Sequence, residues 1–99
     1  MSAIVLVRFQ VDRAQFERVH GERGEEFRQV AEQGRAAGCL HHQFAAAGNE
    51  MIVVDEWESG AAFEKFFDNA TVASLMADAG VQGPPEVTIY ESVSTVDRF

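Results

Sequence analysis

With only 99 residues, the chain has room for one domain, and its hydrophobic fraction of 46% is typical of a globular protein with a single core. The formal net charge of −8, with Lys65 as the only lysine, argues against a nucleic-acid or anionic-membrane surface, because phosphate contacts need clustered cations. The lone Cys39 cannot form an internal disulfide, the N-terminus lacks the layout of a signal peptide, and no apolar run approaches the roughly 20 residues of a membrane span. We therefore expect one cytoplasmic domain over residues 1–99.

The first strand is predicted at residues 3–11, which are rich in apolar and β-branched side chains. Asp12 is a suitable N-cap for a following helix, and Gly38 is a suitable C-terminal stop. Gly21 and Gly24 weaken the middle of this helix by up to about 1 kcal/mol each relative to alanine, so we expect a kink or break there. Its apolar positions recur at three- and four-residue steps: Phe16, Val19, Phe27, Val30 and Ala31.

A β-hairpin is predicted over residues 40–57. Gly48-Asn49 between two apolar runs is typical of a two-residue turn, because glycine tolerates the positive φ of the first position. Side chains alternate faces along a strand, so His41 is expected to point toward Glu56, on the opposite face from His42. The two histidines therefore cannot bind the same metal ion. A turn of this length pairs Ala46 with Met51, Phe44 with Val53, His42 with Asp55 and Leu40 with Trp57.

The second half of the chain predicts another helical segment and a last strand. Ser59 is placed to cap a helix, and Asp68-Asn69 is typical of a break and a fresh cap before a second apolar stretch that ends at Gly80. Gly83-Pro84-Pro85 predicts a rigid loop. The last strand is expected over residues 86–94.

The resulting order β-α-β-β-α-β predicts an α+β, ferredoxin-like fold with a four-stranded antiparallel sheet and both helices on one face. The first and third strands would be central, and these two strands are apolar on both faces. Two helices cover only one face of the sheet, and monomers rarely leave a large apolar patch exposed. A second copy of the sheet is the simplest cover for the other face, which predicts a two-fold homodimer. The patch would comprise Ile4, Leu6, Ile52, Val54 and Tyr90.

Arg8 lies in the first strand and faces the opposite way from Val7 and Phe9. A buried and unpaired arginine would cost too much free energy. We therefore expect Arg8 to pair across the dimer interface with Glu56 or another acid.

The predicted pair of His42 and Asp55 would set two ionisable groups within an apolar face. A histidine beside a carboxylate on a half-buried sheet is more often a satisfied structural hydrogen bond than a catalytic dyad. Titrating groups of this kind nevertheless cluster in functional sites. Both interpretations stay open at this point, with His42 and Asp55 as the candidate catalytic residues.

A family resemblance is carried by residues 51–59, MIVVDEWES, followed by Ala61-Ala62-Phe63 and Phe66. This stretch resembles the antibiotic biosynthesis monooxygenase (ABM) domains of the dimeric α+β barrel superfamily, in which an apolar third strand commonly ends in an acidic-Trp-x-Ser signature. In element order the resemblance covers nearly the whole chain, and in residues it is specific over 51–67. It implies a homodimer with face-to-face sheets and, in each protomer, a pocket between sheet and helices.

The resemblance leaves the chemistry open, because the family includes cofactor-free oxygenases of polycyclic aromatic substrates, heme-degrading enzymes and proteins without an assigned activity. The heme degraders resemble one another in an Asn on the first strand and a Trp and a ligating His on the second helix. Val7, Phe66 and Met76 stand at those places here, so heme degradation is not expected. No spaced Cys/His set or phosphate-binding glycine loop is present, and we expect no cofactor and no metal.

Two functions from different classes are consistent with these features. The first is a cofactor-independent monooxygenase of a small aromatic or quinol-type substrate, in which His42, oriented by Asp55, takes a phenolic proton and the anion reacts with oxygen. The second is a non-catalytic homodimer that binds a small apolar ligand or only shares the scaffold. A cavity that reaches His42 would favour the first. The expected substrate-binding side chains, which are equally suited to a core, are Phe9, Phe44, Trp57, Phe63, Phe66 and Met76.

Overall fold

The structure, a computed structural model, describes residues 2–99 and confirms the predicted α+β fold. Both predicted helical connections consist of two helices, so the order is β-α-α-β-β-α-α-β. The elements are β1 (Ala3–Gln10), α1 (Arg13–Glu22), α2 (Gly24–Ala37), β2 (Cys39–Ala47), β3 (Glu50–Trp57), α3 (Gly60–Phe67), α4 (Ala70–Asp78) and β4 (Gln82–Glu91).

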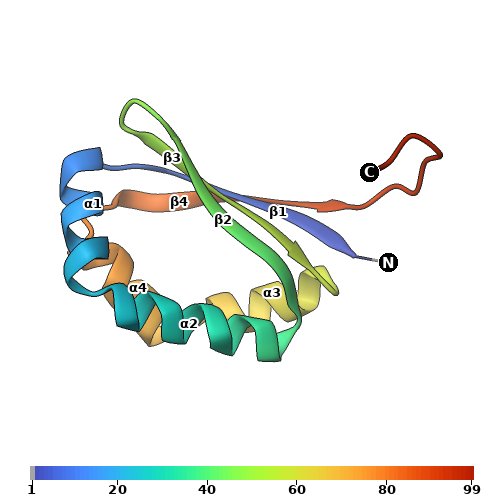
Figure 1. The fold of residues 1–99 in the computed structure, drawn as a ribbon, viewed down its shortest axis with the longest axis horizontal. Coiled ribbons are helices and arrows are strands. Elements are labelled where there is room, and N and C mark those ends of the chain that lie inside the picture. The colour runs from blue at the N-terminus through green and yellow to red at the C-terminus, as the bar shows by residue number, and fades with distance from the viewer. Residues whose placement is uncertain (1) are drawn as a thin grey trace.

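The four strands form one antiparallel sheet in the order β2-β3-β1-β4. The central strands are β1 and β3, as their apolar sequences predict. In Figure 1, α2, α3 and α4 lie below one face of this sheet, α1 lies at the end of the sheet beside the ends of β1 and β4, and the other face carries no helix. The molecule therefore has two layers, with its core between them.

The helix breaks occur where the sequence predicts them. Arg23 ends α1 and precedes α2, so the break falls between Gly21 and Gly24. Asn69 caps α4, because its side-chain oxygen accepts hydrogen bonds from the backbone N–H groups of Thr71 and Val72. Each helical connection therefore consists of two short helices with one break between them.

The core lies on the helix-facing side of β1 and β3, whose residues are alternately buried and more exposed. Trp57, Val5 and Val7 are among the most deeply buried side chains. Helix residues that complete this core include Phe16, Phe63 and Leu75, and Ala79, the C-cap of α4, is also fully buried.

The opposite face of the sheet is apolar at its centre and only half-buried in the single chain. Tyr90 on β4 is 51% exposed. The central strands contribute four half-buried aliphatic side chains to this face: Ile4, Leu6, Ile52 and Val54.

Arg8 pairs with acids of its own chain, so a partner across an interface is not needed to neutralise its charge. Its guanidinium pairs within the chain, with Glu50 at 2.9 Å and Glu86 at 3.9 Å, because these acids lie beside it on β3 and β4. Glu56 has other partners: the Ser2 hydroxyl donates to its carboxylate over 2.6 Å, and Arg98 lies 3.5 Å away.

The last strand differs from its predicted bounds. It begins at Gln82 and runs through Gly83-Pro84-Pro85, which the sequence assigned to a loop, and it ends at Glu91 rather than at Ser94. Proline is tolerated here because β4 is an edge strand, where a missing N–H donor need not break a ladder. Among the described residues, no helix has the length and apolar character needed to cross a membrane.

Candidate functional site

The β2–β3 hairpin has the predicted register over most of its length. Gly48 adopts a positive φ of 61° in the two-residue turn, and His42 stands opposite Asp55. The predicted pairing of Leu40 with Trp57 is wrong. A register shift between Cys39 and His41 leaves Leu40 outside the ladder and brings Cys39 opposite Trp57. A bulge of this kind is not encoded in the alternation of apolar residues.

His42 and Asp55 form a direct hydrogen bond, with 2.7 Å between Nδ1 and Oδ1. Asp55 is buried at 6% exposure, whereas the side chain of His42 is 39% exposed. An ionised carboxylate only accepts hydrogen bonds, so Nδ1 carries the hydrogen and donates it. In the neutral imidazole, the lone pair is then on Nε2, which makes this nitrogen the available base.

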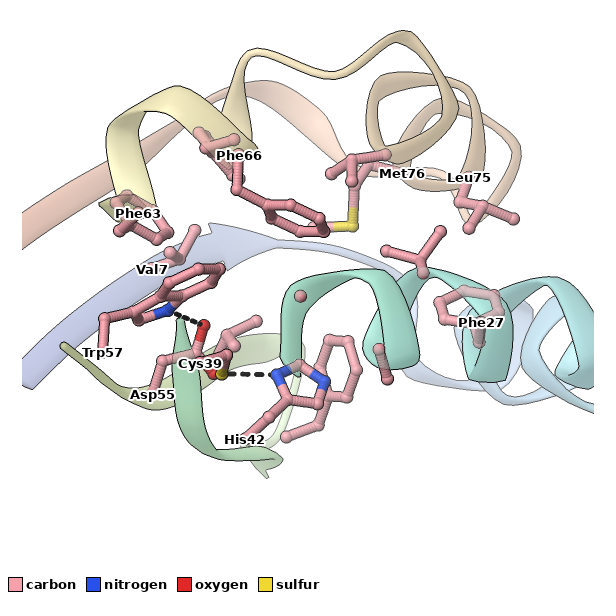
Figure 2. Close-up of a pocket in the computed structure, with 17 residues that line it drawn as sticks. Val7, Phe27, Cys39, His42, Asp55, Trp57, Phe63, Phe66, Leu75 and Met76 are labelled. Carbon is pink, nitrogen blue, oxygen red and sulfur yellow. Dashed lines mark hydrogen bonds and ion pairs between the residues drawn. The ribbon is translucent and has the colours of Figure 1, made fainter. Parts of the chain in front are cut away.

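Trp57 completes a three-residue network. Its indole Nε1–H donates to Oδ2 of Asp55 over 3.0 Å, so each carboxylate oxygen of Asp55 has its own donor (Figure 2). Asp55 and Trp57 are two residues apart on β3, and side chains at this spacing share a face. The network therefore follows from strand geometry, with His42 supplied by the neighbouring strand.

Across the described part of the chain, every buried side-chain nitrogen or oxygen has a hydrogen-bond partner. Burying a carboxylate is costly unless its charge is compensated by hydrogen bonds, and Asp55 receives two. The network is thus stable as a structural element and, by the same contacts, holds the imidazole of His42 in one orientation.

A cavity of about 100 Å³ lies between the sheet and the helices, and it reaches His42 and Asp55 (Figure 2). Its wall is almost entirely apolar, so the imidazole and the carboxylate form a polar corner. Phe66 and Met76 face this space from the helical layer (Figure 2). The lining residues are Val7, Phe27, Val30, Ala31, Gly34, Cys39, His42, Phe44, Val53, Asp55, Trp57, Phe63, Phe66, Phe67, Val72, Leu75 and Met76.

Among the side chains named from the sequence, Phe9 alone lies apart from the cavity. It packs in the core against Phe16, with 6.4 Å between ring centroids. The other named side chains that line the cavity are His42, Phe44, Asp55, Trp57, Phe63, Phe66 and Met76.

One wall of the cavity is formed by α2, which contributes none of the site residues predicted from the sequence. The signal was present in the three- and four-residue apolar spacing of Phe27, Val30 and Ala31, which continues to Gly34. That spacing marks the face of a helix toward the core and does not distinguish a filled core from a cavity.

Aromatic rings hold the polar corner in place. Phe44 meets the His42 ring edge to face, with centroids 5.2 Å apart and an angle of 80°. Phe63 and Phe66 contact the Trp57 ring at centroid distances of 5.7 Å and 5.4 Å. These packed rings restrict the rotamers of the two side chains that flank Asp55.

Cys39 also lines the cavity, with its Sγ 3.3 Å from the backbone oxygen of His41. Burial raises the pKa of its thiol to about 11, and the negative charge of Asp55 adds to this effect. The thiol is therefore protonated at neutral pH and lacks the character of a nucleophile. Residues 2–99 contain no cluster of three or more His, Cys, Asp or Glu side chains placed to bind a metal ion.

Comparison with solved structures supports the fold. A monooxygenase from the gene ActVA-Orf6 of Streptomyces coelicolor, solved in complex with Nanaomycin D, has a TM-score of 0.70 at 20% identity, over 99% of this chain and 93% of that one. SnoaB, a cofactor-independent oxygenase from Streptomyces nogalater, has a TM-score of 0.67 at 16% identity and 98% coverage of both chains. An antibiotic biosynthesis monooxygenase homologue from Nitrosomonas europaea has a TM-score of 0.68 at 12% identity, over 93% and 90% of the chains.

At these identities, the likeness to solved structures concerns the fold alone. No curated protein matches the sequence. The sequence model of one family, described as antibiotic biosynthesis monooxygenase, matches residues 2–78, which is most of the chain. The protein therefore belongs to the antibiotic biosynthesis monooxygenase family.

Proposed function

We propose that this protein is a cofactor-independent monooxygenase of a small phenol or quinol. The observation that carries this proposal is that an apolar cavity reaches the His42–Asp55 pair, so a bound aromatic ring and a base share one space. Family membership supports the general kind of reaction. The cavity is smaller than the ~300–1,000 Å³ pockets of larger ligands, which favours a substrate with a single ring.

The first step is proton transfer from the phenolic hydroxyl to Nε2 of His42. Asp55 holds the imidazole through Nδ1 and stabilises the cation that forms. The apolar wall excludes water from the resulting phenolate, which keeps it electron-rich.

The phenolate then reacts with O2. One oxygen atom forms a bond to a ring carbon that carries hydrogen, and the O–O bond breaks. The other oxygen atom leaves as water, so phenol and O2 give quinone and water. The substrate supplies all four electrons that reduce O2, and no further reductant is needed.

The proposal is tested by oxygen uptake with a panel of electron-rich phenols and quinols. His42→Ala is expected to abolish turnover, and Asp55→Asn is expected to slow it by about 10²-fold or more through loss of the orienting acceptor. His41→Ala is the matched control, because His41 pairs opposite Glu56 and is absent from the cavity wall. If the His42 and Asp55 variants keep full activity toward a turned-over substrate, the pair is not the site.

The second candidate is a non-catalytic dimer that binds a small apolar ligand. The observation in its favour is the complete satisfaction of Asp55 by His42 and Trp57, which a purely structural role also explains. Under this alternative, no phenol or quinol of the panel is turned over. His42→Ala and Asp55→Asn would then lower only the stability, by about 1–3 kcal/mol for each unsatisfied buried partner.

We also infer that the active form is a homodimer whose sheets pack face to face. The helix-free face of the sheet supports this, because its centre is apolar and half-exposed in a single chain. The chain is taken to act as one domain in the cytoplasm, where the free Cys39 would stay reduced.

A further inference from the structure

Gly34 is a buried residue in the interior of α2, and it lines the cavity. A glycine inside a helix is less favourable than an alanine because its backbone loses more conformational freedom on folding. A glycine at such a position is expected only where the backbone or the packing requires it.

Neither the backbone nor the packing requires glycine at this position. Gly34 has no positive φ, unlike Gly38, whose φ is 117°. A Cβ added to Gly34 would lie 3.6 Å from the ring of Phe66 and 3.8 Å from Cβ of Cys39, which are ordinary van der Waals distances. Gly80 shows the contrast, since a Cβ there would lie 2.7 Å from the side chain of Gln15.

The absent methyl group therefore leaves space that belongs to the cavity. A methyl group is comparable in size with a water molecule. In a cavity of about 100 Å³, an added methyl group takes an appreciable part of the room for a ligand. The space lies between Phe66 on the helical layer and Cys39 at the start of β2.

We propose that Gly34 is a specificity-determining residue, which widens the cavity enough to admit one aromatic ring. The inference rests on the proposed function and deepens it by naming the ligand class. The class is a single-ring phenol with its polar group on one edge, because the polar side chains of the cavity gather at the His42–Asp55 corner and the remaining wall is apolar. The hydroxyl lies at that corner, and an apolar edge of the ring occupies the space beside Gly34.

The experiment measures binding rather than turnover. Trp57 is the only tryptophan, and its indole N–H lies at the cavity, so one NMR signal reports the site. Phenol is titrated under nitrogen, which excludes oxidation, into the full chain and into Gly34→Ala. Gly21→Ala is the matched control, because Gly21 is helical and exposed and has no atom within 4 Å of an added Cβ.

Gly34→Ala is expected to weaken phenol binding by about tenfold or more, the usual effect of one methylene in a hydrophobic pocket. The same substitution is expected to raise Tm by roughly 2–8 °C through helix propensity. Gly21→Ala is expected to raise Tm similarly and leave the phenol Kd unchanged.

Three results would overturn the inference. Unchanged phenol binding by Gly34→Ala would show that the space is not used, and it would leave the His42-dependent reaction standing. A lowered Tm or a failure of Gly34→Ala to fold would show that packing needs this glycine. Absence of phenol binding by the unmodified protein would show that single-ring phenols are not the ligand class. The proposed function would still be supported if the protein turned over another substrate and His42→Ala lost that activity.

Discussion

Trp57 donates its indole hydrogen to the carboxylate oxygen of Asp55 that His42 leaves free. Trp57 and Asp55 lie on the same face of β3, and both are buried. The indole N–H of Trp57 is therefore a conformationally restricted donor that holds the Asp55 carboxylate, and this carboxylate in turn orients the imidazole of His42. The strand that carries the family signature thus fixes the direction of a base on the next strand.

Trp57→Phe tests this arrangement. Phenylalanine keeps an aromatic ring near Phe63 and Phe66 but removes the N–H donor to Asp55. We expect the free energy of unfolding to fall by about 1–3 kcal/mol, because one buried carboxylate oxygen loses its partner. Denaturant titration measures this change, and kcat is expected to fall with it. Phe99→Leu, a change at a fully exposed aromatic side chain outside the sheet, is the control. Equal stability of the two variants would contradict the role of the N–H group.

The sheet and the hairpin were predictable because their signals are local and strong. The element order and the apolar character of both faces identified β1 and β3 as central strands, and the Gly48-Asn49 turn was enough to set His42 opposite Asp55. The hydrogen bond from Trp57 to Asp55 also follows from a two-residue spacing, but sequence gives no rotamers, so the sequence alone could not specify it.

The parts that sequence did not predict depend on tertiary context. The bulge at Leu40 shifts the pairing without any special residue. Strand structure through Pro84 and Pro85 is tolerated only because β4 is an edge strand of the sheet. The charge of Arg8 is neutralised by acids whose positions on the neighbouring strands depend on the strand order. A cavity cannot be predicted from apolar spacing at all, since a filled core has the same pattern.

Ile52→Glu tests the homodimer. Ile52 lies on the helix-free face in the central strand β3, and a carboxylate there would be desolvated without a partner if two sheets pack together, at a cost of several kcal/mol. We expect the dimer to dissociate, as measured by sedimentation at micromolar concentration. Gln33→Glu adds the same charge to an exposed position of α2 and should remain dimeric. An unmodified protein that sediments as a folded monomer would contradict the dimer.

Arg23 gives a prediction on acid stability. It joins the α1–α2 junction to Asp78 of α4 and donates two hydrogen bonds to Glu26, at 2.8 Å and 2.7 Å. The hydrogen bonds from Arg23 hold the pKa of Glu26 below its ordinary value of 4.5. A lowered pKa in the folded state means that this contribution to stability is present above the ordinary pKa and is lost as the pH falls through the folded-state value.

We therefore expect Arg23→Gln to lower Tm at pH 7 and to have progressively less effect as the pH falls below about 4.5. Thermal unfolding between pH 2 and pH 7 measures this. Arg28→Gln is the control, because Arg28 makes only one exposed contact of 3.9 Å, with Glu25. The same Tm difference between the two variants at every pH would rule out the linkage.

Cys39 gives the last prediction, which concerns the electrostatics of the cavity. Burial and, to a smaller extent, the negative charge of Asp55 together raise the pKa of its thiol from 9.0 to about 11. Only the thiolate is nucleophilic, so at pH 8 the reactive fraction is about 100-fold smaller than for a thiol with the ordinary value. A raised pKa also means that folding favours the neutral thiol, and this contribution to stability is present below pH 9 and is lost as the pH rises toward 11.

We expect the rate of Cys39 alkylation by iodoacetamide to rise up to about pH 11 in the folded protein and to level off near pH 9 in urea. Asp55→Asn should lower the folded midpoint, because it removes the negative charge and keeps the size of the side chain. His41→Ala is the control, because the thiol contacts the backbone oxygen of this residue and not its side chain. A folded midpoint near 9 would show that Cys39 and the cavity it lines are accessible to water, and the apolar environment assigned to the phenolate would then be wrong.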